Sequence, residues 1–200
     1  MTEPGAPELE LTASRYLPFP VARVWSACVT KEGLERWWSP ADLRTTVRRL
    51  DVRPGGAVSL HVRYVPALLT PESAEAFRAA HIPIAFDLQG RLSEVVEGRV
   101  LSFDLALDLG RAGSTVTMVT RLELEADGNG TRVRAIGRGP GTPHWVTLGR
   151  QNLAAQLERL EQAVRASQDV GAPSRTTAIR RAPREGRPDP EQTREGRRPA

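Results

Sequence analysis

Apolar and polar positions alternate in seven segments of this 200-residue chain. Alternation places every second side chain on the same face, as in a strand with one buried face. Tight turns separate most of the successive segments, and such short connections join antiparallel strands. We therefore expect one antiparallel sheet built from residues 8–15, 44–52, 57–65, 84–94, 99–109, 114–125 and 131–138.

Two short helices are predicted between the first two strands. Apolar residues recur there at spacings of three and four, which places them on one helical face. These residues are Val21, Val24, Trp25 and Cys28. Thr30 is a suitable N-cap for a second helix over 31–38, which ends in two adjacent tryptophans. Adjacent residues on a helix cannot point the same way, so we expect one tryptophan to face the sheet or a cavity and the other to close the helix junction.

Two further helices complete the pattern. The first is a short excursion over 71–81, and the second begins at Pro143 and continues to about residue 167. The second is on the order of 35 Å long, enough to cross a sheet. The order is strand, two helices, six strands and a final helix. It predicts an α+β helix-grip fold, in which a curved antiparallel sheet wraps around the C-terminal helix.

Turn residues support this order of elements. Arg53-Pro54-Gly55-Gly56 has the proline and glycine that a type II turn requires, because its third position has a positive φ. Asp127-Gly128-Asn129-Gly130 is typical of a β-hairpin. The glycine run over 137–141 lies between the last strand and the final helix. We interpret it as a loop, because it lacks the third glycine of a dinucleotide-binding motif.

The composition of the chain indicates a single folded domain between two ends that are less ordered. Hydrophobic residues make up 40% of the chain, which is sufficient for one core. We expect a flexible N-terminus over 1–7, the helix-grip domain over 8–168 and a disordered Arg/Pro-rich tail over 169–200. The tail has eight arginines and five acidic residues, a net charge of +3, out of +4 for the whole chain. The domain itself is therefore nearly neutral, and we do not expect nucleic acid to be a partner.

The cysteine and histidine content and the hydropathy of the chain argue against a disulfide, a metal site and a membrane span. Cys28 is the single cysteine, so no disulfide forms, and its place on an apolar helical face favours a buried thiol over a nucleophile. His61, His81 and His144 lie in separate segments without ligand spacing, so we expect no metal and no cofactor. The N-terminus is acidic and polar, and no apolar run reaches membrane-spanning length. We expect a cytoplasmic protein that does not insert into membranes.

The motif residues resemble those of the SRPBCC superfamily, which includes START lipid-binding domains and the birch-pollen allergen fold. More narrowly, the chain resembles the group related to the C-terminal domain of the activator of the heat-shock chaperone ATPase. The resemblance covers about residues 8–165. The residues that carry it are Phe19-Pro20, Val24-Trp25, Leu34, Trp37-Trp38, Pro40, the turn over 53–56 and Gly130-Thr131-Arg132.

This resemblance implies an apolar cavity between the sheet and the final helix. We expect it to bind a small hydrophobic molecule, either a lipid or an aromatic metabolite, without catalysis. The candidate ligand-binding residues are Trp38, Leu60, Val62, Tyr64, Phe86, Phe103, Met118, Trp145 and Asn152. For both Trp37 and Trp38, a place in the core is the favoured interpretation over stacking on a ligand. The polar residues that periodicity places inward are Tyr64, Thr120, Asn152 and Gln156.

Two alternatives remain. The resemblance to the chaperone activator implies an interaction protein that binds a partner on its outer surface. Some members of the superfamily are enzymes, such as cyclases or hydratases. General acid–base catalysis requires a titratable group in the pocket, and periodicity places only Tyr64 there. We predict no catalytic residue, and whether the chain is an enzyme stays open.

Overall fold

The computed structural model describes residues 8–39, 42–65, 67, 71, 74, 75, 78, 83–108, 115–141 and 143–171. Residues 1–7 and the tail beyond 171 lie outside this part of the chain, as does most of the helix predicted over 71–81. Among the described residues, no helix is both long enough and apolar enough to cross a membrane.

Seven strands form one sheet in which every neighbouring pair is antiparallel. Their order is β1-β7-β6-β5-β4-β3-β2, so six successive strands form a meander and β1 joins its last strand. The strands are β1 (Glu8–Leu17), β2 (Leu43–Leu50), β3 (Ala57–Tyr64), β4 (Ala85–Val96), β5 (Val100–Asp108), β6 (Thr115–Asp127) and β7 (Gly130–Pro140).

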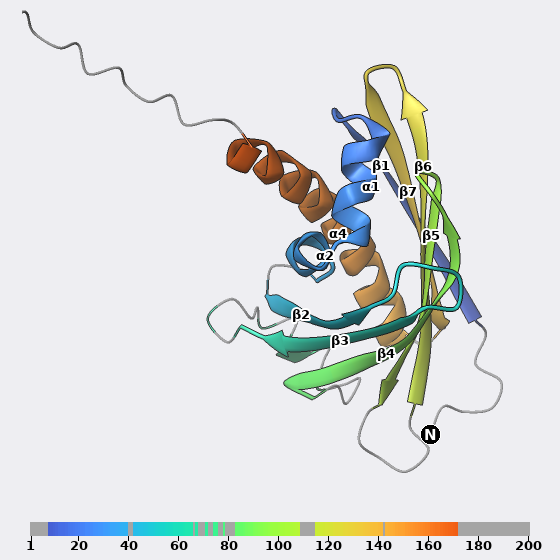
Figure 1. Ribbon diagram of the computed structural model, residues 1–200. Coiled ribbons are helices and arrows are strands. Elements are labelled where there is room, and N and C mark those ends of the chain that lie inside the picture. Colours follow the sequence, from blue (N-terminus) through green and yellow to red (C-terminus); the bar gives the residue numbers. More distant parts are fainter. Residues whose placement is uncertain are drawn as a thin grey trace, which may run out of the picture.

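The sheet curves around the long helix α4 (Pro143–Gly171), and α1 (Val21–Val29) and α2 (Lys31–Trp37) lie beside α4 on the same side (Figure 1). The predicted α+β helix-grip fold is therefore confirmed. The turn between β2 and β3 also forms as predicted. Gly55 has a φ of 76°, and the Gly56 amide donates to the Arg53 carbonyl over 2.8 Å.

Hydrogen bonds fix the corner between α1 and α2. The Thr30 hydroxyl caps α2 by accepting from the Gly33 amide over 3.2 Å. Gly33 is required there, because a Cβ would collide with the Ala27 carbonyl. The same carbonyl accepts the Trp37 indole N–H over 2.9 Å, and Trp37 is only 1% exposed. Trp37 thus closes the helix junction, as predicted for one of the two tryptophans, and this leaves Trp38 on the side of the sheet.

The second half of α4 packs tightly on the core. Leu157, Leu160 and Val164 are at most 2% exposed. Two polar residues of α4 bind neighbouring elements. The Arg159 guanidinium donates two hydrogen bonds to the Arg36 carbonyl, and Glu161 accepts from Arg15 over 2.7 Å. These contacts attach α4 to α2 and to β1.

Replacing Trp37 with phenylalanine tests the importance of this corner. The variant loses the indole hydrogen bond and leaves the buried Ala27 carbonyl without its donor, so we expect Trp37→Phe to lower the free energy of unfolding by about 2 kcal/mol. Trp25 lies on the same helix pair but is only partly buried, so Trp25→Phe should cost less than about 1 kcal/mol. Urea unfolding measures both, and equal losses would contradict the assigned role of Trp37.

Candidate functional site

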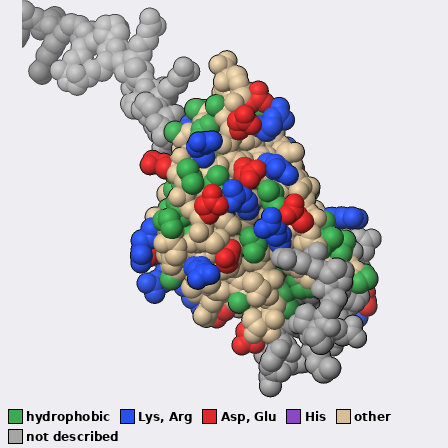
Figure 2. All heavy atoms as spheres, turned by 90° about the vertical axis from the view of Figure 1, so that its right-hand side faces the viewer, with side chains coloured by type: hydrophobic (Ala, Val, Ile, Leu, Met, Phe, Trp, Pro, Cys, Tyr) green, Lys and Arg blue, Asp and Glu red, His purple; other side chains and the backbone are tan. Residues whose placement is uncertain are grey.

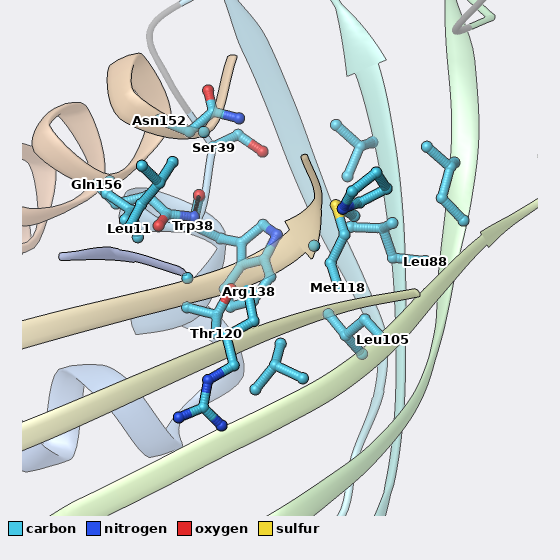
Figure 3. Close-up of a pocket in the computed structure, with 18 of the residues that line it drawn as sticks. Leu11, Trp38, Ser39, Leu88, Leu105, Met118, Thr120, Arg138, Asn152 and Gln156 are labelled. Atoms are coloured by element: carbon cyan, nitrogen blue, oxygen red, sulfur yellow. Dashed lines mark hydrogen bonds between the residues drawn. The ribbon is translucent and has the colours of Figure 1, made fainter. Parts of the chain in front are cut away.

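A cavity of about 150 Å³ lies between the sheet and the first half of α4. All seven strands, the residues that follow α2 and one face of α4 contribute to its wall (Figure 3). It occupies the space where the predicted ligand site was expected. It is smaller than a site for a drug-sized ligand, which typically has roughly 300–1,000 Å³.

The side chains of β7 explain why the cavity lies at this end of the helix. The residues that face α4 become smaller along the strand, from Val133 through Ala135 to Gly137 and Gly139. Leu153 of α4 covers Gly137, where an added Cβ would lie 3.2 Å from its Cδ1. Over Gly139 the nearest atoms of the described residues would be 3.8 Å from such a Cβ. The cavity therefore opens where glycine leaves the inner face of β7 without a side chain.

This strand corrects one expectation. The glycine run over 137–141 was expected to be a loop, but β7 continues as far as Pro140. Glu8 to Leu11 of β1 pair with Pro140 to Gly137 in antiparallel register, and this pairing keeps the glycines extended. Glycine has a low strand propensity, so its composition alone favours a loop. Pairing with an existing strand overrides that preference.

One end of the cavity is apolar. Its side chains come from the inner faces of β3, β4, β5 and β6, and Leu88, Leu105 and Met118 lie together on that side in Figure 3. The other lining residues of this end are Val62, Phe86 and Leu107.

The opposite end contains neutral polar groups. Trp38 follows α2 and is 6% exposed, and its ring packs on Phe103 with centroids 4.9 Å apart. The Gln156 amide of α4 donates to the Trp38 carbonyl over 2.6 Å. Ser39 and Asn152 lie near this contact, on the side of the cavity opposite Leu88 (Figure 3). Trp38 is thus the tryptophan that faces the cavity.

No charge is directed into the cavity by the described residues that line it. Arg138 is the one ionisable residue among them, and its guanidinium points away from the cavity (Figure 3). There it donates to Glu10 over 2.8 Å. The described wall therefore offers hydroxyls, amides and an indole, but no carboxylate, imidazole or thiol.

The predicted ligand-binding residues fall into three groups. Five of them line the cavity, namely Trp38, Val62, Phe86, Met118 and Asn152. Leu60, Tyr64 and Phe103 are buried on the same face of the sheet but lie outside the described lining. The side chain of Trp145 is outside the described part of the chain. Of the inward polar residues, Thr120 and Gln156 also line the cavity.

Other lining residues were not predicted as site residues. Alternation places Leu9, Leu11, Leu105 and Leu107 on the inner face, and all four contact the cavity. Alternation gives the face but not the position of the helix along the strand, so it could not single them out. The pattern of apolar and polar residues did not identify Gly137 and Gly139, because they border the cavity by having no side chain.

The remaining candidates for chemistry lie away from the cavity. Burial raises the pKa of Tyr64, and nearby Asp42 raises it further, so the phenol stays neutral. His61 contacts Asp87 over 2.7 Å on the outer face of the sheet, and this hydrogen bond is the main cause that lowers the pKa of Asp87. No cluster of three or more potential metal ligands occurs among the residues that the structure describes.

Solved structures of low sequence identity share this fold. A protein of Chromobacterium violaceum is 21% identical, with a TM-score of 0.61 over 78% of this chain and 96% of its own. A protein of Mycobacterium smegmatis is 19% identical, with a TM-score of 0.58 and coverages of 82% and 93%. The AHSA1-like protein of Aeromonas hydrophila is 18% identical, with a TM-score of 0.55 and coverages of 80% and 94%. No family model and no curated protein matches the sequence. The similarity therefore supports the helix-grip fold and shows nothing beyond it.

Cys28 provides a pH test of the core beneath α1. It is fully buried, and burial raises the pKa of its thiol from 9.0 to about 12. Between these values the thiol ionises in the unfolded chain but not in the folded chain. The unfolded state then binds fewer protons, so the free energy of unfolding must fall as pH rises from about 9 to 12.

We expect Cys28→Ala to reduce the slope of this fall, whatever its effect on stability at neutral pH. Urea unfolding at a series of pH values measures the slope. The native thiol should also react with Ellman's reagent at least about 100-fold more slowly than the unfolded thiol. Equal slopes in both chains, or rapid reaction of the native thiol, would contradict a buried and inert Cys28.

Proposed function

We propose that this chain binds a small, uncharged and mainly apolar molecule in the cavity between the sheet and α4, without catalysis. The observation that carries the proposal is the space over Gly139, which leaves about 150 Å³ within an apolar wall. An apolar cavity of roughly this volume holds one benzene-sized ring. Of the two predicted ligand classes, the volume favours a one-ring aromatic molecule over a whole lipid.

Membership of the SRPBCC superfamily is part of this proposal. It is supported by the fold and by the motif residues that carry the resemblance. In the structure these residues have structural roles: Trp37 closes the helix corner, and the Thr131 hydroxyl donates to the Phe19 carbonyl over 2.7 Å. Such roles support a shared fold more than a shared ligand. A cytoplasmic location stays a prediction.

An interaction protein is the second candidate, and the likeness to the AHSA1-like structure favours it. Figure 2 shows acidic and basic side chains interspersed over the outer face of the sheet. Arg121, for example, contacts Glu94 and also Glu123. On the face in view, the paired charges of the described residues leave no single-sign patch for a partner, so ligand binding is the better-supported function. An enzyme ranks third, because the described wall offers no inward acid or base.

Toluene is a suitable probe for the proposed function. We expect saturating toluene to raise the melting temperature of the native chain by about 3–5 °C, as for a ligand present at ten times its Kd. Benzoate, which carries a charge that the cavity cannot pair, should cause no shift. Differential scanning fluorimetry measures both.

Gly139→Leu tests whether the shift arises in this cavity. A leucine at 139 would extend into the open space, so this variant should fold but lose the response to toluene. Thr117→Leu is the matched control, because Thr117 is exposed on the opposite face of the sheet, and it should keep the response. The proposal fails if toluene causes no shift in the native chain, or if Gly139→Leu responds as the native chain does.

A further inference from the structure

We propose that the bound molecule carries an uncharged hydrogen-bond acceptor, as an aryl ketone does, which receives the indole N–H of Trp38 while the ring lies beside Leu88, Leu105 and Met118. This inference rests on the proposed ligand site and adds the chemical class of the ligand.

The first observation is a hydrogen-bond donor that faces the cavity. Trp38 is 6% exposed, and its indole nitrogen points into the space between its ring and Met118 (Figure 3). Among the described residues, none accepts a hydrogen bond from this N–H, and the one hydrogen bond that α4 makes to Trp38 goes to its backbone carbonyl. The indole of Trp37, by contrast, donates to the Ala27 carbonyl. A ligand acceptor in the cavity could therefore form one hydrogen bond with this N–H, for a net gain of about 1 kcal/mol.

The second observation is that the donor is held in place. The Trp38 ring packs against Phe103 and against Trp37, with centroid separations of 4.9 and 5.7 Å. Its backbone carbonyl is bound by the Gln156 amide of α4. Because packing and this hydrogen bond restrict the residue, little side-chain freedom remains to be lost when a ligand binds. The geometry suits selection of one acceptor position.

The third observation concerns charge. The described wall directs no cation into the cavity, and Arg138 is bound to Glu10 outside it. A buried carboxylate ligand would therefore have no counter-ion, at a cost of several kcal/mol. The Ser39 hydroxyl is already paired with Thr45 over 2.5 Å. The remaining polar groups of this end, those of Thr120 and Asn152, are neutral. A ketone, ester or amide oxygen fits this set, whereas an acid does not.

Two probes of nearly the same shape separate the hydrogen bond from apolar burial. Acetophenone has a ring and a carbonyl oxygen, and α-methylstyrene replaces that oxygen with a methylene group. We expect Trp38→Phe, which keeps the aromatic ring and removes the N–H, to weaken acetophenone binding about fivefold, as loss of one hydrogen bond of about 1 kcal/mol does. Binding of α-methylstyrene should change less than about twofold. Calorimetric or NMR titration gives both dissociation constants.

The hydrogen bond can also be tested in the native chain, without relying on a variant that folds. In a ¹⁵N–¹H spectrum the four tryptophans give separate indole signals. Acetophenone should shift the Trp38 indole proton downfield, and α-methylstyrene should not. Trp25→Phe is the control variant, because Trp25 lies outside the cavity wall, and it should leave both affinities unchanged.

The outcomes distinguish the two proposals. If both probes bind but the Trp38 signal responds alike to each, the ligand site stands and the proposed hydrogen bond is wrong. A Trp38→Phe variant that loses affinity for both probes equally would also contradict the hydrogen bond. If neither probe binds the native chain, the ligand site itself is wrong, and this inference fails with it.

Discussion

The contact between α4 and the inner face of the sheet is the constraint on which the rest of this structure depends. In the second half of the helix, large apolar side chains fill the interface, and Leu160 and Val164 are almost fully buried. In the first half, the facing residues of β7 shrink to glycine, and Gly149 of α4 lies so close to Leu11 that a Cβ would be 2.7 Å from its Cδ1. The two ends of one helix therefore have different functions: one stabilises the fold, and the other borders the cavity.

Apolar burial and one hydrogen bond contribute differently to binding in the proposed site. Burial of a one-ring molecule, at about 25 cal/mol per Å² over the roughly 150–250 Å² that an aromatic group covers, yields about 4–6 kcal/mol before the cost of association. Without that cost, such a value would correspond to a dissociation constant between about 1 mM and a few tens of micromolar, so the actual binding is weaker than this range. A hydrogen bond to Trp38 changes this by only about fivefold. Apolar burial thus determines affinity, and the indole determines which ring compounds are preferred.

The sequence predicts the fold more fully than the site. Alternation in residues 57–65 correctly placed Leu60, Val62 and Tyr64 on the inner face of the sheet. Only Val62 lines the cavity, because the crossing point of α4 along the strand depends on packing among distant elements. Of the two adjacent tryptophans, Trp38 was the predicted ligand-binding residue and it lines the cavity, although the pattern held no physical reason to prefer it over Trp37. That choice follows from the hydrogen bond of Trp37 to the Ala27 carbonyl, a contact across the helix corner.

The cavity itself has the weakest sequence signal. Its opening depends on the absence of a side chain at Gly139, and a glycine next to a proline is typical of loops. Only the pairing of Leu9 with Gly139 reveals that this glycine belongs to a strand. A cavity that depends on a missing side chain can be predicted only when the pairing of its strand is known. The buried face of a strand or helix, by contrast, can be predicted from its own sequence.

The most direct test of an accessible cavity between the sheet and α4 is a crystal structure of the chain soaked in iodobenzene. We expect an anomalous iodine peak within the cavity, among Trp38, Met118 and Gly139. Side chains that fill this space, or iodine bound only at other positions, would contradict the account.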